Sequence, residues 1–201
     1  YKNYFIKNWE YKMMDRIFSE EFIKDFFSNN FSKRYLHKKN ILQNSQDIMS
    51  LDVLNEILSM KSYWNNKNFK MVLDRQPISY SNFSSVSLEH STEIFRPDVD
   101  KVQNWISKGS SLVLTEVEKL TNRLNNIVKE LQDLTNGKCQ GNLYFSMQSR
   151  QAFGPHCDDH DVFAIHFEGE KVWNIYENVE KNPINHPMFK YSAEERQRKA
   201  G

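Results

Sequence analysis

The sequence predicts an α+β protein in which a largely helical half precedes an antiparallel β half. Aliphatic residues recur at steps of three and four after residue 115, which is typical of one face of a helix. After residue 140 the apolar residues occur instead in short, strand-like segments. The 201 residues are about the length of one domain. We therefore expect residues 1–109 to form a helical and mixed flanking region and residues 110–201 to hold the β-rich part.

Composition and charge exclude several classes of protein. Hydrophobic residues make up 39% of the chain and aromatic residues 13%, which is typical of a globular protein. Lys and Arg number 27 and Asp and Glu 26, so the net charge is +1 and a dedicated nucleic-acid site is not expected. No apolar run approaches the roughly 20 residues of a bilayer-spanning helix. Cys139 and Cys157 do not suggest a disulfide framework, which favours a cytoplasmic location.

The first hundred residues carry weaker signals than the rest. Residues 10–40 are expected to be helical with polar interruptions, because EEFIKDFF places its phenylalanines at helical spacing. SLDVLNEILSM, residues 50–60, predicts a short amphipathic helix capped by Ser50. Residues 62–95 are rich in Ser and Asn, and we expect loops and short strands there.

The clearest pattern begins at residue 110. Ser110 to Thr115 predicts a buried strand, and Thr115 with Glu118 matches a capping box that would start a helix. We expect that helix to run for about five turns and to end at Asn136-Gly137 in a left-handed cap. Its apolar stripe consists of Val117, Leu120, Leu124, Ile127, Leu131 and Leu134.

Strand signals follow the helix to the end of the interpretable pattern. NLYFSM, DVFAIHFE and KVWNIYE, at residues 142–147, 161–168 and 171–177, predict three strands. Glu168-Gly169-Glu170 between the last two predicts a tight hairpin turn. The second half of the chain is therefore expected to be an antiparallel sheet.

The most informative chemistry lies in GPHCDDHD, residues 154–161. If this stretch is a strand, His156 and Asp158 point to the same side, where an imidazole and a carboxylate can bind one metal ion. A second His would complete the facial triad of non-haem Fe(II) oxygenases. His160 is a poor candidate, because four extended residues span about 13 Å. Cys157 would face the opposite side as a packing residue, and a Cys ligand would instead suit a softer metal such as zinc.

Two further histidines do not supply an obvious third ligand. His166 lies on the next expected strand, where we interpret it as a packed, hydrogen-bonded core histidine. His186 lies between prolines in an expected loop.

Residues 141–177 resemble the JmjC-type cupin oxygenases and are most similar to their ribosomal oxygenase branch. The pattern of that branch combines N-x-Y, H-x-D-D and V-F-x-x-Q-x-E-G-x-K-x-W. The matching residues here are Asn142, Tyr144, His156, Asp158, Asp159, Val162, Phe163, Glu168, Gly169, Lys171 and Trp173. FIKDFFSNNFSKRYLHKKN and SKGSSLVLTEVEKL, upstream, are also similar to the family. His166 departs from the pattern, because it occupies the position of the Gln.

The resemblance implies a double-stranded β-helix, or jelly-roll cupin barrel, with N-terminal flanking helices, and residues 110–201 would be its first part. It implies that Fe(II) is held by His156, Asp158 and a distal His, and that Lys171 pairs with the 5-carboxylate of 2-oxoglutarate. It also assigns Asn142 to co-substrate binding, and we assign Tyr144 to substrate binding. The distal His of the family would fall beyond Gly201, so we expect a chain truncated before the last barrel strands.

The resemblance implies an Fe(II)- and 2-oxoglutarate-dependent oxygenase that hydroxylates a protein side chain, with a ribosomal protein as the expected substrate. One alternative is a hydroxylase of a free amino acid or small metabolite, because a fold does not decide its substrate. Another is a non-catalytic cupin that binds a protein partner. A His on a later strand would favour an enzyme over a binding module. We expect no membrane partner, and a homodimer stays open.

Overall fold

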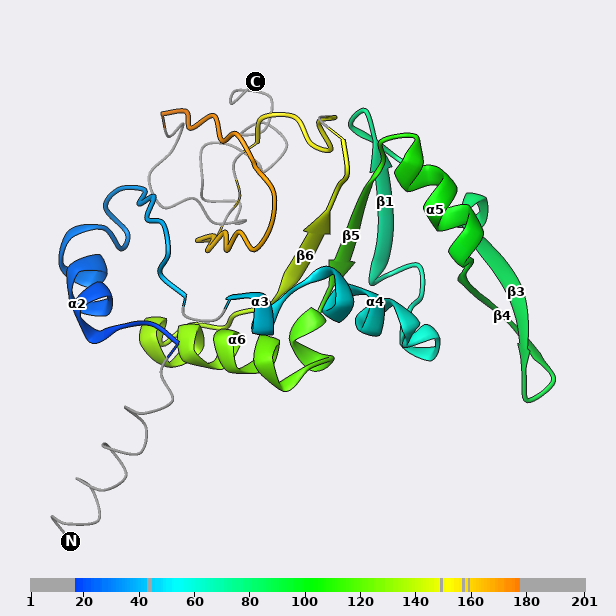
Figure 1. Ribbon diagram of the computed structural model, residues 1–201, viewed down its shortest axis with the longest axis horizontal. Coiled ribbons are helices and arrows are strands. Elements are labelled where there is room, and N and C mark those ends of the chain that lie inside the picture. The colour runs from blue at the N-terminus through cyan, green and yellow to red at the C-terminus, as the bar shows by residue number, and fades with distance from the viewer. Residues whose placement is uncertain (1–16, 43–44, 149, 157, 159, 178–201) are drawn as a thin grey trace, which may run out of the picture.

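Helices and antiparallel strands are combined in the computed structural model, which describes residues 17–42, 45–148, 150–156, 158 and 160–177. Helices lie below and beside a small sheet, and a separate hairpin projects at one end (Figure 1). This mixture confirms the α+β class expected from the sequence. No helix among the described residues is long and apolar enough to cross a membrane.

The main sheet has four antiparallel strands in the order β2-β1-β5-β6. Their bounds are Phe69–Leu73 for β1, Gln76–Pro77 for β2, Ser111–Thr115 for β5 and Asn142–Phe145 for β6. Strand β5 is central and nearly fully buried, as its apolar run predicts. The sheet joins strands from both sides of residue 109, and the proposed division of the chain at that residue stays a prediction.

One face of this sheet forms the main core. Strand register aligns Phe69 with Leu114 and Met71 with Leu112, and all four side chains belong to one buried cluster. Helices α4 (Leu51–Ser59), α5 (Val99–Ser107) and α6 (Asn122–Thr135) contribute the other side of that cluster. Burying one such aliphatic side chain stabilises a fold by about 1.5–3 kcal/mol. The core therefore fixes the sheet and, through it, the position of β6.

The opposite face of the sheet carries a different set of side chains. Lys70, Val113 and Tyr144 are direct neighbours across β1, β5 and β6. Tyr144 and Asn142 are exposed, whereas Leu143 and Phe145 pack against the core. This face is therefore where the polar residues of β6 are displayed.

Short polar side chains cap the helices. Ser50 accepts the Val53 amide with its hydroxyl, which confirms the cap predicted for α4. Asp98 caps α5 by accepting the Lys101 amide at 3.1 Å, and it also accepts the Ser85 hydroxyl at 2.6 Å. These hydrogen bonds, the one from Ser85 foremost, hold the pKa of Asp98 below its usual range.

The start of α6 differs from the prediction. The expected capping box at Thr115 is wrong, because Thr115 stays in β5 and Glu116 adopts a left-handed conformation with φ 62°. The 3₁₀ turn η3 (Val117–Lys119) follows, and the helix is capped by Thr121, whose hydroxyl accepts the Leu124 amide at 3.2 Å. The helix has 14 residues, about four turns rather than five.

Two other sequence signals for α6 are confirmed, although Val117 and Leu120 of the expected apolar stripe precede the helix. Leu124, Ile127 and Leu131 are buried on one face, as the spacing of three and four predicts. Asn136 ends the helix in the left-handed region, with φ 51°.

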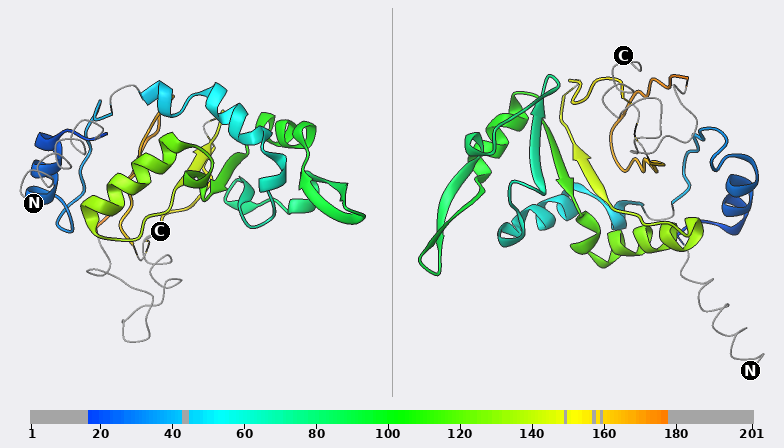
Figure 2. Two further views of the ribbon diagram at one scale, coloured as in Figure 1. Left: turned by 90° about the horizontal axis from the view of Figure 1, so that it is seen from below. Right: turned by 180° about the vertical axis from the view of Figure 1, so that it is seen from behind.

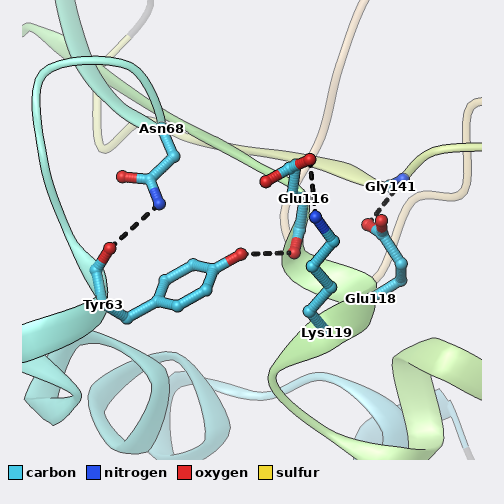
Figure 3. Close-up of polar contacts among 6 residues, drawn as sticks. All are labelled: Tyr63, Asn68, Glu116, Glu118, Lys119 and Gly141. Carbon is cyan, nitrogen blue, oxygen red and sulfur yellow. Dashed lines mark hydrogen bonds and ion pairs between the residues drawn. The ribbon is translucent and has the colours of Figure 1, made fainter.

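The turn between β5 and α6 anchors the beginning of β6 (Figure 3). The Glu118 carboxylate accepts the Gly141 amide at 3.0 Å, and the Val117 amide donates to the Gly141 carbonyl at 3.1 Å. Tyr63 donates its hydroxyl to the Glu116 carbonyl at 3.1 Å from the other side. Glu118 therefore binds a residue distant in sequence instead of closing a local capping box.

The remaining elements lie at the two ends of the molecule. Strands β3 (Ser84–Glu89) and β4 (Thr92–Pro97) form the projecting hairpin, with η2 (Tyr80–Asn82) beside it (Figure 1). Helix α2 (Glu20–Asn29) lies at the opposite end, and α3 (Ser45–Ile48) and η1 (Lys61–Tyr63) flank α4.

The strands predicted at residues 161–168 and 171–177 are wrong, because within the described part of the chain these residues join no ladder. A ladder needs a partner backbone about 4.8 Å away, whereas alternation in sequence specifies only which side chains share a side. The alternation of side chains between two sides is nevertheless observed in residues 163–167. Phe163, Ile165 and Phe167 pack toward α6 and α2, and the segment lies between α2 and β6 in two opposite views (Figures 1 and 2).

Candidate metal and co-substrate site

His156 lies on an irregular segment that follows β6, so the strand expected around it is wrong. Its Nδ1 lies 2.9 Å from the Gly154 carbonyl oxygen. A carbonyl oxygen only accepts, so Nδ1 donates in this contact, and Nε2 is the ring nitrogen left to bind a metal. Nε2 in turn lies 3.8 Å from Oδ1 of Asp158. The local hydrogen bond therefore brings the imidazole and the carboxylate together without a strand.

This pair fits a divalent transition metal. Imidazole nitrogen and carboxylate oxygen are the ligand types of non-haem Fe(II) sites. Metal bonds of about 2 Å would place neighbouring ligand atoms about 3 Å apart, somewhat closer than the observed 3.8 Å. Both side chains are about two-fifths exposed, at 42% and 38%, so they have room for that adjustment. Among the residues described, no group of three His, Cys, Asp or Glu side chains converges on one point.

His160 and His166, the other described residues considered as ligands, form no three-residue metal group with this pair. His160 is exposed and joins no three-residue metal group within the described residues. His166 is also exposed, with Nε2 2.8 Å from the Glu168 carbonyl oxygen, so its interpretation as a packed core histidine is wrong. Cys157, Asp159 and His186 lie outside the described residues.

Lys171 lies against two aromatic rings. Its Nζ is 4.7 Å from the ring centre of Trp173 and 5.7 Å from that of Tyr144. Cations within about 6 Å of an aromatic face are attracted to it. Lys171 and Trp173 thus lie on one side, as predicted, and that side faces the exposed surface of β6.

An aromatic contact joins this lysine region to the proposed metal pair. The Tyr144 and Phe153 rings are 6.0 Å apart, and the Phe153 and His156 rings are 6.2 Å apart. His156, Phe153, Tyr144 and Lys171 therefore form a continuous series of contacts. Asn142 lies two residues before Tyr144 and therefore on the same side of β6.

Such an arrangement is suited to an elongated anionic ligand. A dicarboxylate held at the His156–Asp158 pair has a second carboxylate some distance away, and an ammonium group there fixes its orientation by a charge-assisted hydrogen bond. The rings of Tyr144 and Phe153 connect the two ends through successive contacts.

Phe153 was not predicted as a site residue from the sequence, although it connects the two parts of the site. The available signal was weak: one aromatic residue three positions before His156 in a segment already rich in Phe and Tyr.

Residues 114–199 match the family model of the JmjC domain. The chain is 30% identical over 132 residues to a bifunctional lysine-specific demethylase and histidyl-hydroxylase NO66 of Drosophila sechellia, covering 66% of this chain and 19% of that protein. It is 24% identical over 172 residues to the protein of the same name in Dictyostelium discoideum, covering 84% and 31%. It is 28% identical over 75 residues to ribosomal oxygenase 1 of Gallus gallus, covering 37% and 12%.

The chain thus spans about a fifth of the first of these relatives and less than a third of the second. The family match begins within β5 and includes β6, His156, Asp158 and Lys171. Residues 114–199 are therefore similar to the JmjC domain family, and the chain resembles proteins of the ribosomal oxygenase branch of that family.

Proposed function

We propose that this chain is part of an Fe(II)- and 2-oxoglutarate-dependent oxygenase that hydroxylates a protein side chain. In this proposal the β-rich part belongs to a double-stranded β-helix, and His156 and Asp158 are two of its iron ligands. Lys171 binds the distal carboxylate of 2-oxoglutarate, Asn142 contacts the same co-substrate, and Tyr144 faces the substrate. A third ligand is expected from a distal His.

The orientation of His156 is the observation that carries the proposal. Its Nδ1–H donates to the Gly154 carbonyl, which directs the Nε2 lone pair toward the side where Asp158 lies 3.8 Å away. Metal-binding histidines commonly donate their second ring N–H to a carbonyl or carboxylate in this way. The family relationship supports the same two residues.

Bound iron would supply the oxidative chemistry, in which one atom of dioxygen would enter the succinate formed by decarboxylation of 2-oxoglutarate and the other would enter the substrate. The residues of this chain would bind and orient the reactants. Lys171 fixes the far end of the co-substrate, while Tyr144 and Phe153 connect it to His156 through contacts between neighbouring rings.

We further propose a histidine side chain of a ribosomal protein as the first substrate to test. Two observations support this choice: the relatives include proteins named as a histidyl-hydroxylase and as a ribosomal oxygenase. The cytoplasmic location and the homodimer stay predictions.

The test is succinate formation by the complete protein with Fe(II), 2-oxoglutarate and ribosomal-protein peptides. We expect His156→Ala and Asp158→Ala each to abolish succinate formation, because each removes a metal ligand. His166→Ala is the matched control, because it removes an exposed histidine from the same region and should keep turnover. Undiminished turnover in both ligand variants would refute the metal assignment.

The same assay separates the alternatives. Turnover with free amino acids but not with peptides would favour a small-molecule hydroxylase. Peptide binding that requires neither metal nor 2-oxoglutarate, without turnover, would favour a non-catalytic binding module.

A further inference from the structure

A strained turn lies beside the segment that leads to His156. Asp74 and Arg75 form the two-residue connection between β1 and β2, since Leu73 pairs directly with Gln76. Both have positive φ, 49° and 67°. Turns of this kind favour Asn-Gly or Asp-Gly, because side chains other than those of Asn and Asp are disfavoured in the left-handed region. Arginine in such a position persists where surrounding contacts hold it.

The contacts of this turn are made with the segment after β6. Nη1 of Arg150 lies 2.7 Å from Oδ2 of Asp74, and Nη2 of Arg75 donates to Oε1 of Gln151 at 2.7 Å. The Arg75 side chain also passes Gly154, where its Cδ would lie 3.9 Å from an added Cβ. Gly154 is the residue whose carbonyl holds the ring of His156. The turn is therefore linked to the proposed ligand through Gly154, which lies beside Arg75 and accepts the hydrogen bond from His156.

The same segment is held from a second side, after α5. Gln148 donates its side-chain amide to the Ser107 carbonyl at 2.8 Å. Gly109, with φ 93°, approaches so closely that an added Cβ would lie 2.7 Å from Cδ of Arg150 and 2.8 Å from Oε1 of Gln148. The end of α5 and the β1–β2 turn together enclose the path from β6 to His156.

These contacts are expected to contribute little to the stability of the fold. The side chains of Arg150 and Asp74 are 47% and 62% exposed. Exposed ion pairs contribute little to folding stability because water screens both charges. Their geometric effect remains, since they join residues 76 positions apart and fix where the segment runs.

We infer that Asp74 and Arg75 are positioning residues for the metal-binding pair. They hold residues 150–154 so that the Gly154 carbonyl orients the imidazole of His156 toward Asp158. The inference rests on the proposed function, because it assigns this turn a task at the proposed metal site.

Arg75→Gly tests the inference, because it should weaken metal binding without lowering the stability of the fold. Glycine adopts positive φ without strain, so the melting temperature should stay equal or rise. Loss of the Gln151 and Gly154 contacts should weaken binding of Co(II), used as a spectroscopic probe for Fe(II), by about tenfold. Titration of the complete protein followed by visible absorption measures the affinity.

The chain contains a matched control turn. His90 and Ser91 connect β3 and β4 in the same way, with φ 50° and 64° and with Glu89 paired to Thr92. Ser91→Gly should relieve similar strain and leave Co(II) affinity unchanged, because that turn is in the projecting hairpin (Figure 1). In addition, Asp74→Arg should weaken Co(II) binding, and the double variant Asp74→Arg/Arg150→Asp should restore it by reversing the ion pair.

The outcomes separate this inference from the function on which it rests. If Arg75→Gly binds Co(II) as tightly as the unaltered protein while His156→Ala does not, the positioning role is refuted and the metal site stands. If His156→Ala also keeps full affinity, the proposed metal site itself is refuted.

Discussion

The sheet core and the segment from residue 150 to residue 177 are built on different principles. In the core, Ile57, Leu112 and Leu114 have no exposed surface. In the later segment, Val172, Trp173 and Ile175 are more than half exposed, and no ladder is formed within its described residues. The residues proposed to carry chemistry all lie on β6 or in that later segment.

This difference shows how the molecule separates stability from function. Apolar burial by α4, α5 and α6 fixes the sheet, and β6 transmits that fixed position to the exposed side of the sheet. His156 and Lys171 are then placed by contacts of single side chains, namely a carbonyl hydrogen bond for His156 and two aromatic rings for Lys171. Functional side chains commonly lie on irregular segments that a rigid scaffold positions.

The largest expected effect comes from making the same substitution in both regions. Ile57→Ala should lower the free energy of unfolding by about 2–5 kcal/mol, because Ile57 is fully buried and its truncation leaves a cavity. Ile175→Ala, at a side chain 57% exposed, should change it by no more than about 0.5–1 kcal/mol. Urea unfolding of the two variants measures the difference. Equal losses would mean that Ile175 is also packed into the core.

A smaller effect distinguishes the two threonines near the start of α6. Thr121→Val should cost about 1 kcal/mol, because it removes the hydroxyl that accepts the Leu124 amide. Thr115→Val should cost less than about 0.5 kcal/mol, because valine suits the end of a strand. Both changes keep the shape of the side chain, so urea unfolding isolates the effect of the hydroxyl. A greater loss at Thr115 would restore the capping box that the structure contradicts.

The smallest effect is a pH dependence within the packed region. The pKa of Asp98 is lowered in the folded protein, chiefly by the Ser85 hydroxyl and then by the Lys101 amide. The resulting stability is present above the ordinary carboxyl value of 3.8 and is lost as the pH falls through the lower value of the folded state. Asp98→Asn keeps a capping oxygen but does not titrate.

The melting temperature of the unaltered protein should therefore fall more steeply than that of Asp98→Asn between about pH 5 and about pH 2. Parallel curves for the two proteins would show that Asp98 does not contribute to the acid sensitivity. A thermal unfolding series at several pH values provides the measurement.

The local sequence pattern was sufficient to predict the helices and strands of the packed region. It was insufficient where the structure depends on contacts between residues distant in sequence. The apolar spacing predicted α4, β5, most of α6 and β6, because it determines which side chains share the buried face of a helix or strand. Glu118 was misassigned because its carboxylate binds the Gly141 amide, 23 residues away, instead of a neighbouring donor. The strands expected after residue 160 failed for a related reason, since alternation does not specify a pairing partner.

The candidate site was predictable in part. The H-x-D spacing correctly indicated that His156 and Asp158 would lie on one side, even though the strand on which that argument depended is absent from the described residues around them. The relation of Lys171 to Trp173 also followed from spacing of two residues. The turn at Asp74 and Arg75 could not be found in this way, because 76 residues separate each of them from its partner.

The most direct test of the account is whether the lysine region and the metal pair act as one site with separate tasks. Two anaerobic titrations of the complete protein decide this, first with Fe(II) alone and then with 2-oxoglutarate in the presence of Fe(II). The informative variant is Lys171→Ala. Its control is Lys108→Ala, since Lys108 lies 4.8 Å from the ring of Trp105 in a similar contact outside the site.

We expect Lys171→Ala to bind Fe(II) normally and to bind 2-oxoglutarate about 30-fold more weakly or worse, because one carboxylate loses its charged partner. Lys108→Ala should match the unaltered protein in both titrations. Unchanged 2-oxoglutarate affinity in Lys171→Ala would contradict the account, because the residues from His156 to Lys171 would then not form a single binding site.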